Sequence, residues 1–212
     1  ATTEKNLDTQ KHMAHKFFID LAKTPSHIGA GLQILAHNYP ISFQRGAGIT
    51  VQFCAAVANK SQSIRLEVMK SENEIQVLFQ RPNDAFRGLG RILAGSYDFI
   101  EKPYFDTLGI MIDCSRNGVM SLDTMRSILS KVALMGINML MLYTEDTYQV
   151  PGEPFFGYLR GGYTYREMQE IVSYAGHLGI EVIPCIQTLG HLDQVLQWKE
   201  ALMARILKVI CS

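Results

Sequence analysis

Short apolar runs alternate with helix-like segments through the second half of the chain. Leu108–Ile112 and Met139–Tyr143 are two such runs, and a segment with helical spacing separates them. Thr164–Leu178 again has helical spacing, and Glu181–Gln187 is the third strand-like run. Strands that alternate with helices predict a parallel sheet with right-handed crossovers. The sequence therefore predicts an α/β fold.

Local signals mark the ends of the third unit. Thr164 and Glu167 have the spacing of a capping box, in which hydroxyl and carboxylate satisfy free N–H groups at a helix start. Gly179 is a suitable helix stop. Pro184 cannot donate a ladder hydrogen bond, so it suits a strand end where the chain leaves the sheet.

Polar residues follow each predicted strand. Asp113-Cys-Ser-Arg116 follows the first, Thr144-Glu145-Asp146 the second, and Gly190-His191 comes soon after the third. The loops after parallel strands converge at one edge of the sheet and commonly carry the chemistry. An arginine beside carboxylates at that edge could grip a polyhydroxylated ligand.

These same motifs resemble a known family. Asp113-Cys-Ser-Arg116, Glu145-Asp146, Val182-Ile-Pro184 and Gly190-His191 together resemble the opening of the catalytic barrel of glycoside hydrolase family 20, the β-N-acetylhexosaminidases. Tyr143–Tyr148 and Gly152–Tyr158 look like the bacterial exo-β-N-acetylglucosaminidase branch. The resemblance spans about residues 60 to 198, and the order and spacing of the motifs make it specific.

The resemblance implies two domains. Residues 1–100 would form a small α+β domain, and residues 101–212 the first βα units of an incomplete (β/α)8 TIM-type barrel that stops before its fourth strand. Within the first domain we expect helical patterning over 4–35, broken by Pro25 and Gly29–Gly31, and a strand over Ile49–Val57. A hairpin of Ile64–Met69 and Ile75–Phe79 and a helix over Asp84–Leu93 should follow.

Two residues are predicted to bind substrate. By resemblance, Arg116 grips hydroxyls of the terminal sugar, since its planar fork can hold two oxygens. Adjacent residues of an extended strand point opposite ways, so only one acid should face the site; by family match we choose Asp146. A salt bridge of Arg116 with Asp113 or another loop, and a loop-capping role for Glu145, are the alternatives.

Supporting roles are expected for three further residues. Asp113 should orient loop backbone or Arg116, and the resemblance places His191 in a hydrogen-bond network reaching the general acid. Glu145 belongs to this supporting group. Single aromatic residues are more often packing residues than sugar platforms, although they can stack on sugar faces; those near the site are Tyr143, Tyr148, Tyr158, Tyr163 and Trp198.

The family's catalytic pair is missing from this sequence. The resemblance implies retaining hydrolysis in which the substrate's acetamide is the nucleophile, an Asp orients it and the adjacent Glu protonates the leaving oxygen. No Asp-Glu dipeptide occurs here, so the chain should contain no catalytic residue and be inactive alone.

A non-catalytic fragment that self-associates through exposed barrel edges or binds sugar weakly is the alternative, and another barrel hydrolase is a third reading. The tail over Lys199–Ser212 has helical spacing outside the family pattern.

Composition limits the partners. The formal charge is zero, so no basic field favours nucleic acid or anionic lipid, and no apolar run is long enough to span a bilayer. Four scattered cysteines have no metal-ligand spacing, and Cys114, beside the site, is either reactive or, as we favour, a small core residue. We expect no metal or organic cofactor, terminal N-acetylhexosamine as ligand and a cytoplasmic location, unless a leader preceding Ala1 has been removed.

Overall fold

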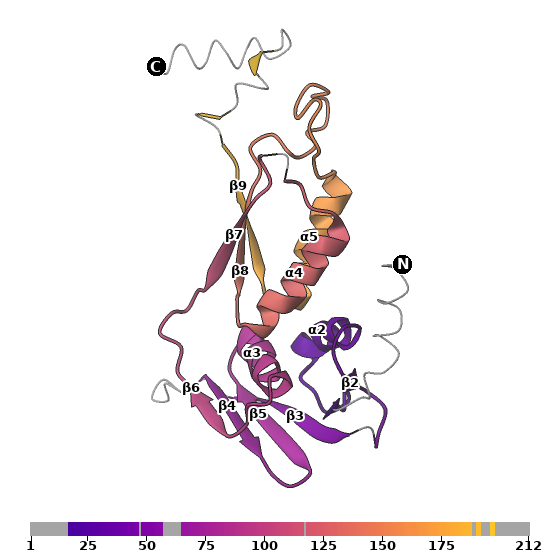
Figure 1. Cartoon of the computed structure of the whole chain (residues 1–212), viewed down its shortest axis with the longest axis vertical. Coiled ribbons are helices and arrows are strands. Elements are labelled where there is room, and N and C mark those ends of the chain that lie inside the picture. The colour runs from indigo at the N-terminus through magenta and orange to yellow at the C-terminus, as the bar shows by residue number, and fades with distance from the viewer. Residues whose placement is uncertain are drawn as a thin grey trace, which may run out of the picture. The chain divides into compact units, whose positions relative to one another are not determined.

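The computed structural model describes residues 17–46, 48–56, 65–116, 118–187, 190–191 and 196–197. They fall into two compact units. The first runs to Asp106 and also includes residues 130–137 and 177–179, and the second comprises Thr107–Leu129, Asn138–Gly176 and the described residues from Ile180 on. The unit boundary thus lies at 106/107, whereas the sequence suggested 100/101. Figure 1 labels the elements.

The first unit is a mixed sheet with two helices. Its elements are β1 (Phe17–Phe18), α2 (Ser26–Ala36), β2 (Ile41–Ser42), β3 (Ile49–Ala55), β4 (Leu66–Lys70), β5 (Glu74–Phe79), α3 (Pro82–Leu93) and β6 (Phe99–Glu101). The strand order is β2-β1-β3-β5-β4-β6. The pairs from β2 to β5 are parallel, whereas β4 is antiparallel to both β5 and β6. The predicted hairpin is confirmed as β4 and β5.

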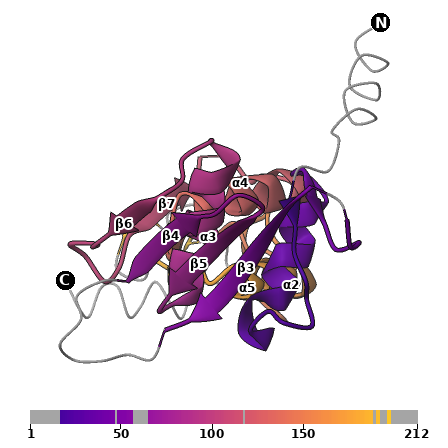
Figure 2. The same ribbon diagram turned by 90° about the horizontal axis from the view of Figure 1, so that it is seen from below.

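The core of this unit lies between the sheet and its helices, which run across one face of the sheet (Figure 2). Ile75, Val77 and Phe79 alternate inward along β5 and are fully buried. Gly88 lets α3 approach closely, because a Cβ there would lie 2.9 Å from Val77 Cγ1. Burial of this alternating face is what fixes the register of the strands.

Both helices of the first unit differ from the sequence expectation. α3 begins at Pro82, two residues early, because proline fits the first helical position, where no N–H is needed. The expected break at Gly29–Gly31 is wrong, since α2 runs through it. Gly31 is required for packing instead: a Cβ there would lie 2.4 Å from Phe86 Cζ. The part of the predicted helical patterning before residue 17 lies outside the described residues.

The second unit contains a three-stranded parallel sheet. Its strands are β7 (Gly109–Asp113), β8 (Met139–Tyr143) and β9 (Glu181–Cys185), in the order β7-β8-β9. The connecting helices are α4 (Leu122–Leu134) and α5 (Tyr165–His177). All three predicted strands are found, within two residues of the expected bounds. The sequence Lys199–Ser212 lies outside the described residues.

The two faces of this sheet differ. Leu140 and Leu142 are fully buried on the face along which α4 and α5 run (Figure 1). Met111, Met141 and Ile183 are paired across the three strands and point to the opposite face, where Met111 is 56% exposed. The capping box that begins α5 is confirmed, since the Thr164 N–H donates to Glu167 (2.8 Å) and the Glu167 N–H donates to Thr164 Oγ1 (3.2 Å).

Candidate functional site

The carboxyl ends of the three parallel strands form a row. Asp113, Tyr143 and Cys185 are paired in register as the last residues of β7, β8 and β9. Every polar segment that the sequence placed after a strand therefore begins at the same edge of the sheet. This is the edge at which ligand sites of α/β folds are usually built.

Asp113 orders the loop after β7. Its Oδ1 accepts hydrogen bonds from the Ser115 hydroxyl (2.6 Å) and the Ser115 N–H (2.8 Å). These bonds hold the pKa of the Asp113 carboxyl below its usual value, because they stabilise the charged form. The geometry matches the loop-orienting role expected of Asp113, and the direct partner of Arg116 is a different acid.

Arg116 pairs with Glu145, across from β7 to β8. Its Nη1 lies 3.2 Å from both carboxylate oxygens of Glu145, and the Tyr143 hydroxyl donates to Glu145 Oε1 at 3.2 Å. Desolvation and this contact with Glu145 raise the pKa of Tyr143, so the phenol remains a donor. The Glu145 side chain is 2% exposed and that of Arg116 is 66% exposed. The acid is thus a buried anchor, and the guanidinium retains solvent-facing donors.

The structure places Glu145, rather than Asp146, opposite Arg116. The alternation argument that favoured Asp146 assumed an extended strand, but β8 ends at Tyr143 and the next residues turn. Glu145 has φ of +53°, which breaks the alternation. Both acids are therefore buried, and each faces its own arginine.

The partner of Asp146 is Arg160, which the sequence reasoning missed. Arg160 Nη1 lies 2.5 Å from Asp146 Oδ1 and 4.0 Å from Glu145 Oε2. Its side chain is only 15% exposed. Between Tyr148 and Tyr163, Arg160 is the only lysine or arginine, and a lone cation in an aromatic, glycine-rich loop is the signal that could have identified it.

His191 lies near the same acid. Its Nδ1 is 3.7 Å from Glu145 Oε1, which is an ion-pair distance only if the imidazole is protonated and is too long for a hydrogen bond. The structure thus brings together Arg116, Glu145 and His191, with Asp146 and Arg160 beside them. The residues flanking the Gly190–His191 pair lie outside the described residues.

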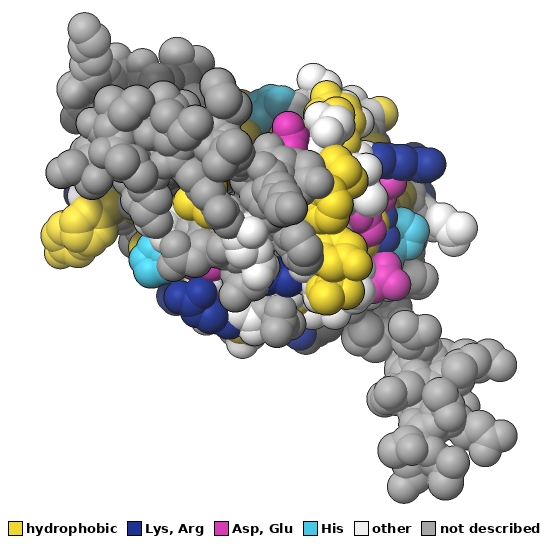
Figure 3. Space-filling model, turned by 90° about the horizontal axis from the view of Figure 1, so that it is seen from above, with side chains coloured by type: hydrophobic (Ala, Val, Ile, Leu, Met, Phe, Trp, Pro, Cys, Tyr) yellow, Lys and Arg dark blue, Asp and Glu magenta, His cyan; other side chains and the backbone are white. Residues whose placement is uncertain are grey.

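The aromatic side chains near the site mostly pack. Tyr148 and Phe156 meet edge to face at 5.0 Å, and the buried Tyr163 donates to the Met120 carbonyl (2.9 Å). Tyr158 is 49% exposed, and Trp198 is not among the described residues. Figure 3 shows basic, acidic and hydrophobic side chains side by side on one face of the molecule, without a broad basic patch on the described part of it.

Cys114 behaves as a core residue. Its side chain is fully buried and its N–H donates to the Tyr143 carbonyl (2.8 Å). Burial raises the pKa of the thiol, which disfavours the nucleophilic thiolate.

Within the described ranges, no cluster of His, Cys, Asp and Glu could hold a metal ion. None of the described helices combines the length and apolarity needed to cross a bilayer.

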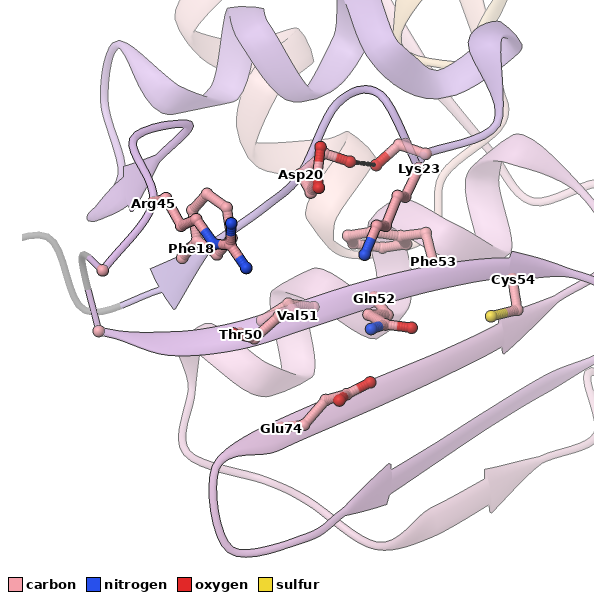
Figure 4. Close-up of a pocket in the computed structure, with 13 residues that line it drawn as sticks. Phe18, Asp20, Lys23, Arg45, Thr50, Val51, Gln52, Phe53, Cys54 and Glu74 are labelled. Atoms are coloured by element: carbon pink, nitrogen blue, oxygen red, sulfur yellow. Dashed lines mark hydrogen bonds between the residues drawn. The ribbon is translucent and has the colours of Figure 1, made fainter.

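A separate hollow of about 570 Å³ lies on the first unit (Figure 4). It is lined by one edge of β3 and by the loops after β1 and β2, with Lys23, Arg45, Asp20 and Glu74 among its residues. None of the polar residues at the ends of β7, β8 and β9 lines it. Cations and acids alternate around it, so its charge favours no single class of ligand.

Three comparisons with known proteins point to one family of hydrolases. The family model for the catalytic domain of glycosyl hydrolase family 20 matches residues 153–210. Beta-hexosaminidase 3 of Arabidopsis thaliana is 30% identical over 115 residues, which cover 50% of this chain and 21% of that protein. Beta-hexosaminidase 1 of Coccidioides posadasii is 28% identical over 177 residues, which cover 76% of this chain and 28% of that protein. The matched parts of the chain are similar to members of glycosyl hydrolase family 20.

Solved structures of this family share the fold. A family 20 exo-β-N-acetylglucosaminidase from Vibrio harveyi superposes with a TM-score of 0.66 at 15% identity, covering 87% of this chain and 35% of that one. A β-N-acetylhexosaminidase from Streptomyces coelicolor gives a TM-score of 0.66 at 19% identity, and the match covers 87% of this chain and 44% of that one. The chain therefore spans less than half the length of these relatives.

Proposed function

We propose that this chain forms one side of the substrate site of a β-N-acetylhexosaminidase. In the full-length parent, the reaction would remove terminal β-linked N-acetylglucosamine or another N-acetylhexosamine. The observation that carries the proposal is the Arg116–Glu145 pair at the ends of adjacent parallel strands. A guanidinium anchored on a buried acid and open to solvent can donate to two neighbouring hydroxyls of a sugar ring.

We further propose that β7, β8 and β9 are the first strands of a (β/α)8 barrel. Their parallel order and the helices that connect them support this reading, as does the similarity to the solved family 20 structures. In such a barrel the residues at the carboxyl ends of the strands face the substrate. Arg116 would then contact the terminal sugar, with Asp113 ordering its loop.

The proposed chemistry is substrate-assisted and retaining. The 2-acetamido carbonyl oxygen of the substrate attacks the anomeric carbon, the glycosidic bond breaks, and the leaving oxygen takes a proton from a carboxylic acid. The oxazolinium intermediate is then opened by water. The sequence has no Asp-Glu pair to orient the acetamide and supply that proton, so the parent must provide both groups from outside these 212 residues.

The decisive experiment compares two substrates in the full-length parent. A chromogenic N-acetyl-β-glucosaminide should be hydrolysed, whereas the β-glucoside with a hydroxyl in place of the acetamide should not. Product analysis by NMR should show the β-anomer first, because two inversions give net retention. Equal turnover of both substrates would exclude participation of the acetamide.

A non-catalytic fragment that self-associates is the second candidate. The observation in its favour is the sheet face of the second unit that carries Met111, Met141 and Ile183, together with the edge strands β7 and β9, for which the described residues provide no further pairing partner. Exposed edges and apolar faces favour association.

A further inference from the structure

We infer that Arg160 is a positioning residue that gives the two adjacent acids different tasks. It holds Asp146 and fastens the loop of residues 149–162, so that Glu145 is the acid left to anchor Arg116. The functional part of this inference rests on the proposed sugar site, whereas the fastening of the loop does not.

The loop is closed at its base by backbone contacts. Tyr148 and Tyr163 form an isolated bridge, and the Gln149 N–H donates to the Tyr163 carbonyl at 2.8 Å. The Tyr163 N–H donates to the Thr147 carbonyl at 3.1 Å. These bonds join the start and the end of the loop directly beside the two acids.

A second contact folds the loop back onto the strand end. Gly157 has φ of +69°, and a Cβ added there would lie 2.4 Å from the Asp146 carbonyl oxygen. The Arg160 N–H donates to the Gly157 carbonyl (3.0 Å), and this turn directs the guanidinium at the Asp146 carboxylate. Backbone and side chain of Asp146 are therefore both in contact with the loop.

Charge explains why two arginines are needed. Glu145 and Asp146 are neighbours, each 2% exposed, and adjacent buried carboxylates repel unless each has a counterion. Arg116 neutralises Glu145 and Arg160 neutralises Asp146. Since Arg160 is far more buried than Arg116, the Arg160 pair is the fixed one and the Arg116 pair is the one that a ligand can reach.

Amide hydrogen exchange on the 212-residue chain tests the fastening. Arg160→Ala should speed exchange at Gln149 and Tyr163 at least about ten-fold, because the loop opens locally when the ion pair is lost. Arg160→Lys should have a smaller effect. The control is Arg166→Ala, since Arg166 is 89% exposed and pairs with Glu170, and it should leave both amides unchanged. Unchanged exchange in Arg160→Ala would overturn the inference.

Kinetics of the full-length parent test the positioning. Arg160→Ala should lower kcat/KM about 10–100-fold well below the melting temperature, the scale expected from small misplacements of a site. Added to Asp146→Asn it should cost little more, because both changes break one contact. Faster exchange with wild-type kcat/KM would mean that Arg160 only fastens the loop. A wild-type parent that hydrolyses nothing would refute the proposed function, while the exchange result would still decide the fastening.

Discussion

Arg116 and Glu145 come from the ends of neighbouring strands, and one guanidinium nitrogen lies 3.2 Å from both carboxylate oxygens. The arginine side chain is mostly exposed while the acid is buried. The guanidinium therefore keeps donors that a ligand could reach, and this exposure is the basis of the role proposed for Arg116.

Replacing Arg116 in the full-length parent tests that role. Arg116→Ala should reduce kcat/KM by an amount equivalent to about 2–5 kcal/mol, the range for losing a charge-assisted contact in a site. Arg116→Lys should also be poor, because an ammonium group lacks the planar fork. Michaelis–Menten kinetics measure both. If the alanine variant kept the wild-type kcat/KM and lost only thermal stability, Arg116 would serve the fold through its salt bridge and would not bind substrate.

The isolated 212-residue chain should not hydrolyse a chromogenic N-acetyl-β-glucosaminide. General acid catalysis alone contributes about 10²–10⁴-fold, and this chain has no Asp-Glu pair to supply the acid. The assay is continuous absorbance at high protein concentration, with the inactive Arg116→Ala chain purified in parallel to detect a contaminating enzyme. Turnover that persists through purification and disappears in that variant would place the catalytic acid within these residues.

Ser115→Ala should raise the pKa of Asp113 towards its ordinary value, because the hydrogen bond from the Ser115 hydroxyl is the largest of the effects that lower this pKa. A lowered pKa in the folded state stabilises the fold above the unfolded value near 4, and that contribution disappears as pH falls through the folded pKa. The stability difference between wild type and variant should therefore be full at neutral pH and shrink below about pH 4. Carboxyl NMR titration and urea unfolding at several pH values measure both effects. An unchanged Asp113 titration would contradict the assignment.

Cys114 should react with iodoacetamide much more slowly than Cys54 and Cys185. Its side chain is fully buried and its thiol pKa is raised, whereas the other two are partly exposed. Mass spectrometry of labelled peptides distinguishes the three sites in one experiment. Equal labelling in the native chain, followed by no further gain in urea, would show that Cys114 is accessible and reactive.

The isolated chain should self-associate at micromolar concentration. Among the described residues, the outer edges of β7 and β9 have no pairing partner, and Met111 is half exposed on one face of their sheet. Such edges and apolar faces favour association. Light scattering coupled to size exclusion measures the mass. Met111→Lys should shift the equilibrium towards monomer, and Met69→Lys, at a 40% exposed position on the other sheet, is the matched control. A monomer that binds no hydrophobic dye would show that the face is already covered.

Much of the fold could be predicted because periodicity and capping act locally. Alternating Ile75, Val77 and Phe79 predicted a half-buried strand, and Thr164 with Glu167 predicted a helix start. Gly31 misled the prediction, because helix propensity treats glycine as a break, whereas here its lack of a Cβ admits Phe86. That packing reason depends on residues distant in sequence.

The sequence predicted that these polar residues would converge, but not how they would pair. Residues after parallel strands must converge at one edge, so Arg116 and the two acids could be placed together. Which acid meets Arg116 depended on a turn at Glu145 that strand alternation does not describe. Arg160 lies 14 residues beyond Asp146, and only the folding of the loop brings it back.

The left-handed backbone of Glu145 has a consequence for how this sequence can change. Most residues other than glycine are disfavoured at φ of +53°, although asparagine adopts such a backbone more readily than glutamate does. Replacing Glu145 by either should therefore relieve the backbone strain while removing the anchor of Arg116. If Arg116 and Glu145 form the proposed sugar site, a lineage released from selection for that site should drift to these residues first. The amino acid at this position would then report whether a descendant still uses the site.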